Sequence, residues 1–532
     1  MRRSVAAWLA FASLALPCLV PRARAGEAER PADANAWRRA GAEAIEQARA
    51  LAPANAKRAK NVILFIGDGM GITTITAARI FDGQRHGTAG EENQLAFETF
   101  PHVALSKTYS VNAQVAESAA TATALLSGVK TNEEVIGLDE LAAPNHYQDV
   151  AANRAETLLE MAEQRGLATG IVTTTRVTHA TPAACYAHVP QRNWEDDSML
   201  PPEAREAGFP DIARQLVEMS IGDGIDVVLG GGRSQFFPQE VQDPEYPGTK
   251  GARTDGRDLI ADWRARHPQG RYLTQRRELV ESKPDGNPVL GLFEPSHMRF
   301  EVERSEDVAG EPSLSEMTAK AIELLSHDPD GFFLMVEGGR IDHAHHLGNA
   351  YRALVETVEV SNAVKTAQAL VAARDTLIVV TADHSHVLAM AGYPTRGNPI
   401  LGLVEGNDAS GKPAGKPLRD MLGLPFTTLS YANGPGYTGA SPEQPEGPKK
   451  FPHMPTGYRG IRKGRPDLSH VEVESPSHLQ EATIPTRNDT HAGEDVPIYA
   501  TGPGAWRIHG VQEQSYVYYV MREALGWGPK TD

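Results

Sequence analysis

Two segments of this chain concentrate acids and imidazoles more densely than ordinary loops do. The first reads Glu337-Gly-Gly-Arg-Ile-Asp-His-Ala-His-His346. Asp342 and His346 stand four residues apart, so on a helical turn both side chains point the same way and can hold one cation. The second segment, Asp383-His384-Ser-His386, offers mixed oxygen and nitrogen ligands, which suit zinc. The two segments together predict a metal centre.

Two further candidate ligands are weaker when each is taken alone. Asp68 stands in Gly67-Asp68-Gly69, where glycines permit a tight turn and close approach by a ligand. Its carboxylate has lone pairs enough to bridge two cations. His491, in Thr-His-Ala-Gly-Glu, could supply a distant imidazole or be a structural histidine.

Ser118 is the candidate nucleophile. It stands in Ala-Glu-Ser-Ala-Ala-Thr-Ala-Thr-Ala, which reads as a loop turning into an Ala-rich helix. The hydroxyl would then lie at or next to a helix N-terminus, where backbone amides and the helix dipole favour phosphate. A plain serine N-cap is the competing interpretation. Because no neighbouring residue supplies a general base, a nucleophilic Ser118 needs a metal to lower the pKa of its hydroxyl.

Short apolar runs rich in β-branched residues alternate with helical patterns and must position these groups. Such runs are typical of strands buried on both faces, and they cover residues 62–66, 170–172, 226–229, 332–336 and 376–380. Ser313-Leu-Ser-Glu316 reads as a capping box that opens a helix through about Ser326. The predicted fold class is therefore α/β, a large, mostly parallel sheet with helices on both faces. The candidate ligands follow the carboxyl ends of the runs, where active sites of such sheets form.

Two other stretches depart from this alternation. Residues 394–487 are rich in Gly, Pro and Ser, and we expect them to form a surface insertion subdomain. Residues 33–51 have the pattern of an N-terminal helix, which we expect to pack on a partner subunit.

The first 25 residues read as an export signal. Arg2 and Arg3 give a basic start, residues 5–20 are mostly apolar, and Ala23-Arg-Ala25 offers a cleavage site. A transmembrane anchor is the alternative, but the run is interrupted by Pro17, and no later run approaches the ~18 apolar residues that a span requires. We expect residues 26–532 to form the mature catalytic domain, periplasmic or secreted, with no membrane anchor.

Charge and cysteine content restrict the partners further. The formal net charge is -16, and removal of residues 1–25 would make it more negative because that segment carries arginines and no acids. Such acidity opposes binding to nucleic acid and to anionic membranes. The mature chain would keep only Cys185, so no intrachain disulfide is expected and a buried thiol is the simplest interpretation.

These motifs resemble those of the alkaline phosphatase family, in particular its animal-type branch. The matching segments are Asn61-Val-Ile-Leu-Phe-Ile-Gly-Asp-Gly-Met-Gly, Val103-Ala-Leu-Ser-Lys-Thr-Tyr, Phe332-Phe-Leu-Met-Val-Glu-Gly-Gly-Arg-Ile-Asp-His and Thr381-Ala-Asp-His-Ser-His-Val. They recur in order from Asn61 to about Val517. The resemblance implies hydrolysis of phosphate monoesters through a phosphoserine at Ser118, with two zinc ions and one magnesium, in a homodimer.

The resemblance also assigns a role to each site residue. Asp342, His346 and His491 would hold the first zinc. Asp383 and His384, together with Asp68, would hold the second. Asp68 would also face a magnesium bound by Thr181 and Glu337. The remaining roles would be Arg192 on two phosphate oxygens, His386 as a residue that orients a ligand, and His179 and His343 as modulators near the metals.

Two positions depart from the family pattern. Glu117 stands where many relatives have aspartate before the serine, and its extra methylene could change how Arg192 is positioned. The resemblance further implies a calcium site made by Glu245, Glu294, Glu311 and the carbonyl of Phe293, although Glu311 replaces an aspartate and loop acids are often simply solvated.

Two rival functions use the same residues. A related two-zinc enzyme could cleave phosphodiesters or nucleotide pyrophosphates, but such diesterases generally lack the magnesium site and the arginine. Thr181, Glu337 and Arg192 therefore favour monoesters. An exported phosphate- or metal-binding protein without turnover is the rival from another class.

Overall fold

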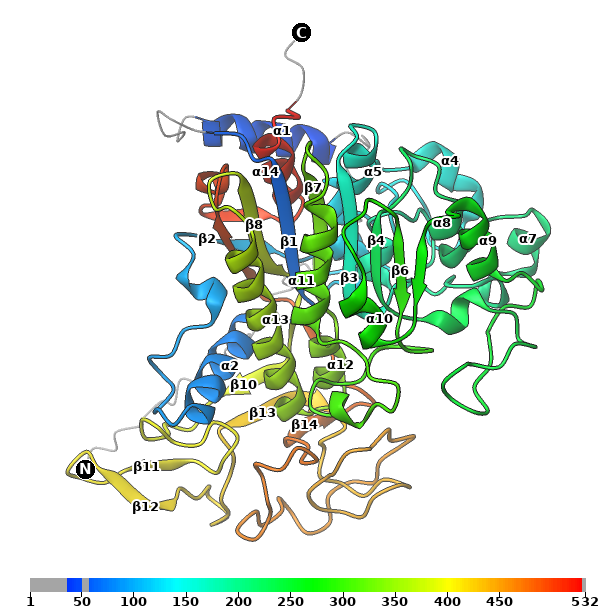
Figure 1. Ribbon diagram of the computed structural model, residues 1–532. Helices are drawn as coiled ribbons and strands as arrows, with labels where there is room; N and C mark the ends of the chain where they lie inside the picture. Colours follow the sequence, from blue (N-terminus) through cyan, green and yellow to red (C-terminus); the bar gives the residue numbers. More distant parts are fainter. Residues whose placement is uncertain (1–35, 50–56, 529–532) are drawn as a thin grey trace, which may run out of the picture.

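A ten-stranded sheet forms the centre of the protein, shown in Figure 1 as a computed structural model that describes residues 36–49 and 57–528. Its strands, in order across the sheet, are β17 (Val511–Glu513), β2 (His102–Lys107), β16 (Val496–Thr501), β8 (Thr376–Ala382), β1 (Asn61–Gly67), β7 (Phe332–Gly338), β3 (Ala168–Arg176), β4 (Val227–Gly231), β6 (Val289–Leu292) and β5 (Arg271–Leu273). β16 runs antiparallel to both neighbours, and the other pairs are parallel. The predicted α/β class with a mostly parallel sheet is confirmed.

The side chains of β1 explain why the sheet is covered on both faces. Val62, Leu64 and Ile66 join one core cluster, whereas Ile63 and Phe65 join the other. Because successive side chains of a strand point to opposite faces, a central strand that is apolar throughout must be buried by helices on each side.

The helices divide between the two faces accordingly. One face is covered by α2 (Ile72–Arg85), α11 (Leu314–Leu325) and α13 (Ala350–Leu370), the last two in front of the sheet in Figure 1. The other face packs against α3 (Ser118–Ser127), α5 (Leu158–Glu163), α6 (Ala180–Ala183), α8 (Ile212–Glu218), α9 (Leu259–Arg266) and α14 (Tyr516–Ala524). The remaining helices are α1 (Ala36–Arg49), which packs on α14, and α4 (Val150–Asn153), α7 (Pro202–Glu206), α10 (Arg276–Glu281) and α12 (Arg340–His346).

The predicted capping box opens α11. The Ser313 side chain accepts a hydrogen bond from the Glu316 amide at 3.2 Å, and the Glu316 side chain accepts one from the Ser313 amide at 3.0 Å. The helix ends at Leu325, with Ser326 as its C-cap. Residues 36–49 of the predicted N-terminal helix are helical too. The predicted export signal lies outside the described residues.

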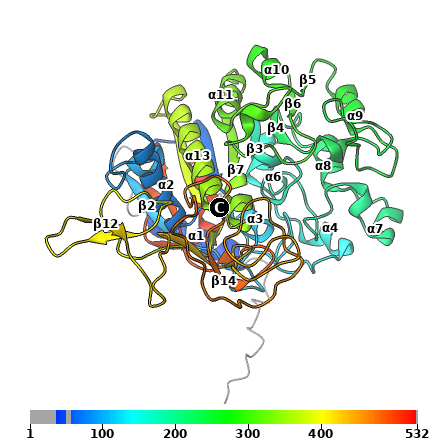
Figure 2. The ribbon, with the colours of Figure 1, turned by 90° about the horizontal axis from the view of Figure 1, so that it is seen from below.

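The segment for which we predicted an insertion carries only short strands. These, with the strands that flank the segment, are β9 (Ser385–His386), β10 (Leu388–Met390), β11 (Glu405–Asn407), β12 (Pro413–Pro417), β13 (Leu429–Gly434), β14 (Ala482–Pro485) and β15 (His491–Ala492). The loops of this segment gather at one end of the molecule, below the sheet in Figure 1 and toward the viewer in Figure 2. β15 pairs with β9, so that His491 lies opposite His386.

Candidate active site

Three carboxylates from neighbouring parallel strands meet at the carboxyl end of the sheet. The register pairs Ile66 of β1 with Glu337 of β7, and Gly67 with Ala382 of β8, so Asp68 and Asp383 follow side by side. All three acids are fully buried. Burial, and then the charges of the neighbouring acids, raise the pKa of Asp68, and burial likewise raises the pKa of Asp383 and of Glu337. A buried cluster of like charges of this kind is stabilised by bound cations.

The described residues of this region form three groups that could hold a cation, each with ligand atoms within 4.8 Å of one another. The groups are Asp342, His346, His386 and His491; Asp68, Asp342 and His384; and Asp68, His179 and Glu337. Asp68 belongs to two of them, as a bridging carboxylate would. Asp383 also faces the second group, because its Oδ2 lies 3.2 Å from His384 Nε2.

The first group has imidazoles whose orientation is fixed by backbone carbonyls. His346 Nδ1 donates to Asp489 O at 2.9 Å, and His491 Nδ1 donates to Ala116 O at 2.8 Å. Since each Nδ1 carries the proton, each Nε2 is free to bind a metal. Both Nε2 atoms lie 3.3 Å from Asp342 Oδ1.

His386 is already engaged on both ring nitrogens. Its Nε2 lies 2.8 Å from Asp342 Oδ1 and its Nδ1 lies 3.0 Å from Asp489 Oδ1. Although burial opposes protonation, these two carboxylates raise the pKa of His386 to about 10. The geometry therefore suits a residue that holds Asp342 in place rather than a ligand.

Asp68, Glu337 and Thr181 each have a buried side-chain oxygen with no hydrogen-bond partner among the described residues. These atoms are Asp68 Oδ2, Glu337 Oε1 and Thr181 Oγ1. The other oxygen of Glu337 accepts hydrogen bonds from Thr173 and Thr175, the latter at 3.1 Å. Unpartnered buried oxygens need an explanation, and a hard cation such as magnesium prefers an all-oxygen environment. The donor set thus fits the predicted magnesium.

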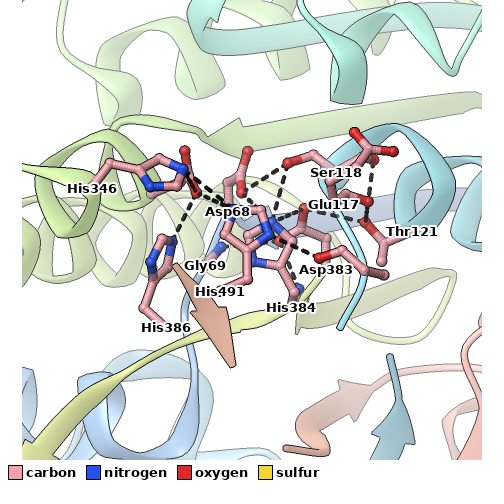
Figure 3. Close-up of polar contacts among 12 residues, drawn as sticks. Asp68, Gly69, Glu117, Ser118, Thr121, His346, Asp383, His384, His386 and His491 are labelled. Carbon is pink, nitrogen blue, oxygen red and sulfur yellow. Dashed lines mark hydrogen bonds and ion pairs between the residues drawn. The ribbon is translucent and has the colours of Figure 1, made fainter. Parts of the chain in front are cut away.

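Ser118 begins α3, and its hydroxyl points into this centre (Figure 3). Its Oγ lies 3.1 Å from His384 Nε2 and 3.5 Å from Asp68 Oδ1. The N-cap of α3 is Glu117, whose carboxylate accepts from the amides of Ala119 and Ala120 at 2.8 and 2.9 Å. The alternative of a serine N-cap is therefore wrong, and the Ser118 hydroxyl is left to face the acids and imidazoles.

Arg192 is held beside the nucleophile by groups on three segments. Its guanidinium pairs with Glu117 and lies 3.0 Å from His179 Nε2, and its amide donates to Glu134 O at 2.7 Å. Burial opposes ionisation of Glu117, but Arg192 and the amide donors hold the pKa of this carboxyl below its usual value. The longer Glu117 side chain thus caps the helix and fixes Arg192 at the same time.

The two remaining predicted histidines lie together on the edge of the centre. The rings of His179 and His343 are 5.5 Å apart, and His343 Nδ1 lies 2.8 Å from Arg340 Nη1. A third ring, His297, lies 4.2 Å from His343.

Sequence reasoning missed His297 and Asp489. His297 stands in a loop with no motif around it, and Asp489 precedes Thr490-His491 by one position. Thr173 and Thr175 directly follow the predicted run 170–172 as polar residues at its carboxyl end, but the sequence did not reveal that they hold Glu337. A search for polar residues next to every candidate ligand, rather than for ligands alone, could have found Asp489.

The residues of the predicted calcium site lie apart from this centre and are only partly brought together. Glu245 and Glu294 form a potential cation group with Asp307. The Glu311 carboxylate instead accepts from the Arg299 amide at 3.1 and 3.2 Å. The Phe293 carbonyl and Glu245 Oε2 accept from the buried guanidinium of Arg233 at 2.8 and 2.6 Å.

Comparison with known proteins agrees with this geometry. The family model described as alkaline phosphatase matches residues 59–527. The chain belongs to the alkaline phosphatase family. It is 45% identical over 511 residues to the tissue-nonspecific isozyme of Gallus gallus, covering 94% of this chain and 91% of that one. It is 42% identical over 506 residues to the alkaline phosphatase of Gadus morhua, covering 94% and 98%.

Solved alkaline phosphatases have the same fold. The Thermus thermophilus enzyme superposes with a TM-score of 0.61 at 26% identity, over 88% of this chain and 92% of that one. Family membership makes the chain a phosphoric monoester hydrolase, as predicted, and the family is metal-dependent. Within the described residues, the helices are all too short or too polar to cross a bilayer.

Proposed function

We propose that this phosphatase transfers the phosphoryl group of a monoester to Ser118 and then to water, releasing an alcohol and inorganic phosphate. The observation that carries the proposal is the position of Ser118 Oγ, at the first turn of α3 and 3.1 and 3.5 Å from His384 and Asp68. A helix N-terminus favours the phosphoryl oxygens, because its amides and dipole are positive there.

The groups described above would hold the cofactors that the family implies. Asp342, His346 and His491 would hold one zinc, Asp68, Asp383 and His384 a second zinc, and Asp68, Thr181 and Glu337 a magnesium. The unpartnered oxygens and the fixed Nε2 atoms support this distribution. When bound, these ions would supply positive charge that favours loss of the serine and water protons and offsets the charge of the transferring group.

The chain's own residues would then do three things. Ser118 supplies the oxygen that bonds to phosphorus while the bond to the alcohol oxygen breaks. Arg192 contributes a planar pair of N–H donors, a geometry that matches two phosphate oxygens. Glu117 keeps that guanidinium in place and secures the N-terminus of the nucleophile helix.

Monoesters are favoured over diesters by Arg192. A phosphate monoester presents several charged oxygens, whereas a diester has exchanged one of them for a second alcohol, so a bidentate arginine gains more from the monoester. Rates on an aryl phosphate and on the matching bis-aryl phosphate should differ strongly in favour of the monoester. Faster cleavage of the diester would support the phosphodiesterase alternative instead.

Ser118→Ala is the direct test of the nucleophile, and Ser127→Ala is its matched control. Ser127 ends the same helix and its hydroxyl donates to Thr123 O at 2.7 Å. Loss of the nucleophile should lower kcat by more than about 10³-fold, while the control keeps most activity. A Ser118→Ala protein with unchanged phosphate release would exclude the proposal, and a chain that binds phosphate without turnover would support the binding-protein alternative.

We also propose a calcium site at Glu245 and Glu294. Asp307 supports it as the third carboxylate because it belongs to the same potential cation group, and the Tyr246 hydroxyl lies 2.7 and 2.8 Å from Glu294 and Asp307. Oxygen ligands of this kind suit calcium. Glu311 and the Phe293 carbonyl, which the resemblance implied, are outside the potential cation group that Glu245, Glu294 and Asp307 form.

Export and dimerisation complete the proposal. The resemblance to the family implies both properties. Light scattering should give twice the mass of the mature chain, and N-terminal sequencing of the exported protein should begin at Gly26. A monomer would contradict the proposed homodimer, and an uncleaved N-terminus would contradict the proposed export signal.

A further inference from the structure

We propose that Asp489 is a positioning residue of the first zinc group, whose carboxylate orients His386 and, through it, Asp342. The inference rests on the proposed function, because it assumes that this group holds zinc. Asp489 stands in the loop between β14 and β15 and does not reach the first group as a ligand.

Among the described residues, the hydrogen bonds and ion pairs of Asp489 join it to two histidines of the group. Its carboxylate oxygens lie 3.0 and 3.2 Å from His386 Nδ1, and Oδ1 lies 3.3 Å from His346 Nδ1. The backbone of Asp489 also binds His346. The Asp489 carbonyl accepts from His346 Nδ1 at 2.9 Å, and the Asp489 amide donates to His346 O at 3.2 Å. The residue is 2% exposed, so water does not replace these contacts.

This arrangement forms a carboxylate–imidazole–carboxylate chain. His386 donates from Nδ1 to Asp489 and from Nε2 to Asp342 Oδ1 at 2.8 Å. A ring held at both nitrogens cannot rotate, so His386 fixes Asp342 Oδ1, the oxygen that also lies 3.3 Å from the Nε2 atoms of His346 and His491. Partners that orient a ligand in this way typically contribute a factor of about 10–100 in metal affinity.

Substitution of the side chain separates its role from that of the backbone. Asp489→Ala keeps the two backbone contacts with His346 but leaves His386 Nδ1 without its acceptor. Asp489→Asn keeps a neutral acceptor and removes the charge. The effect should therefore be confined to the first zinc group, and it should be larger in Asp489→Ala than in Asp489→Asn.

Asn433→Ala is the matched control for the loop itself. The Asn433 carboxamide holds the next residue, with Oδ1 2.9 Å from the Thr490 amide and Nδ2 2.9 Å from Thr490 Oγ1. Its loss loosens the same loop but leaves the carboxylate of Asp489 in place. Zinc affinity should change little in this variant.

The test is a zinc titration of the metal-free, full-length mature chain against a chromogenic chelator, with metal content measured after dialysis. Wild type should bind two zinc ions, and Asp489→Ala should bind one of them about 10–100-fold more weakly. Removal of a carboxylate from a buried pair also lowers the melting temperature of the metal-free protein, so the discriminating readout is a loss of affinity confined to one of the two zinc ions, which a general loss of structure would not give. Equal zinc affinities in wild type and Asp489→Ala, or an equal loss in Asn433→Ala, would overturn the inference.

The same titration separates this inference from the proposed function. If wild type binds no zinc and forms no phosphoserine, the proposed function itself fails. If wild type binds both ions and turns over while Asp489→Ala matches it, only the role of Asp489 fails. Should Asp489→Ala not fold, Asp489→Asn carries the test with a smaller expected loss.

Discussion

Glu117→Gln separates the two tasks that the structure gives to Glu117. The substituted amide can still accept a hydrogen bond from the first turn of α3, but it removes the charge that pairs with Arg192. The paired side chains are only 17% and 14% exposed, so the guanidinium would remain in a poorly hydrated position without its carboxylate. Free Arg192 would then be more available to a phosphate oxygen.

The magnitude follows from the burial of this ion pair. Removal of one partner from a buried pair costs about 3–5 kcal/mol. The residual exposure and the nearby carboxylate of Glu134, which also stabilises the charge on Arg192, reduce this to about 2 kcal/mol of unfolding free energy. Bound phosphate should recover much of the loss, and its inhibition constant should fall about 10-fold, equivalent to about 1.4 kcal/mol.

The assay is urea unfolding with and without inorganic phosphate, together with phosphate inhibition of turnover. Glu98→Gln is the control, because Glu98 pairs with Arg79 and also accepts from the Leu95 amide at 2.9 Å, at an ion pair that is 28% and 11% exposed. That variant should lose stability without recovery by phosphate. If phosphate binds Glu117→Gln no more tightly than wild type, Glu117 does not restrain Arg192 and the reasoning is refuted.

Three other outcomes follow from the structure. Thr181→Val should lower magnesium affinity, measured by metal content and by magnesium-dependent activity, because one of the unpartnered buried oxygens is lost; unchanged affinity would remove Thr181 from the site. Asp307→Asn should abolish thermal stabilisation by calcium while Glu311→Gln should not, and the reverse result would restore the ligand set implied by the resemblance. Burial raises the pKa of Glu163 from 4.5 to about 8, so folding favours the neutral acid and wild type loses stability as the pH rises from about 5 through 8. Glu163→Gln should match wild type near pH 5 and exceed it by up to about 5 kcal/mol at pH 9, and a constant difference between the two pH values would contradict this assignment.

The sequence brings much of the candidate site together because the candidate ligands follow buried strands. Runs such as Val62 to Ile66 identify central strands by their apolar content, and adjacent parallel strands must bring Asp68, Glu337 and Asp383 to one edge. The roles of Arg192 and His491 came from the resemblance alone, since neither residue has a motif that reveals its distant partners.

The rest depended on contacts between residues far apart in the chain. The choice of Glu117 as N-cap needed the backbone angles of the first turn of α3, because serine and glutamate are adjacent and either could cap. Asp307, rather than Glu311, completes the potential cation group of Glu245 and Glu294 through the path of an irregular loop, which no periodicity predicts. The role of Asp489 could be predicted only with the knowledge that its loop crosses the end of α12.

Ser118 is the residue that we propose accepts the phosphoryl group of the substrate. Rapid acid quenching of the metal-loaded chain during turnover of an aryl phosphate, followed by mass spectrometry of its peptides, tests this directly. We expect a single phosphate on Ser118 that appears before steady state and is missing from Ser118→Ala. Phosphate on another residue, or steady turnover with no phosphorylated peptide and with activity retained in Ser118→Ala, would contradict it.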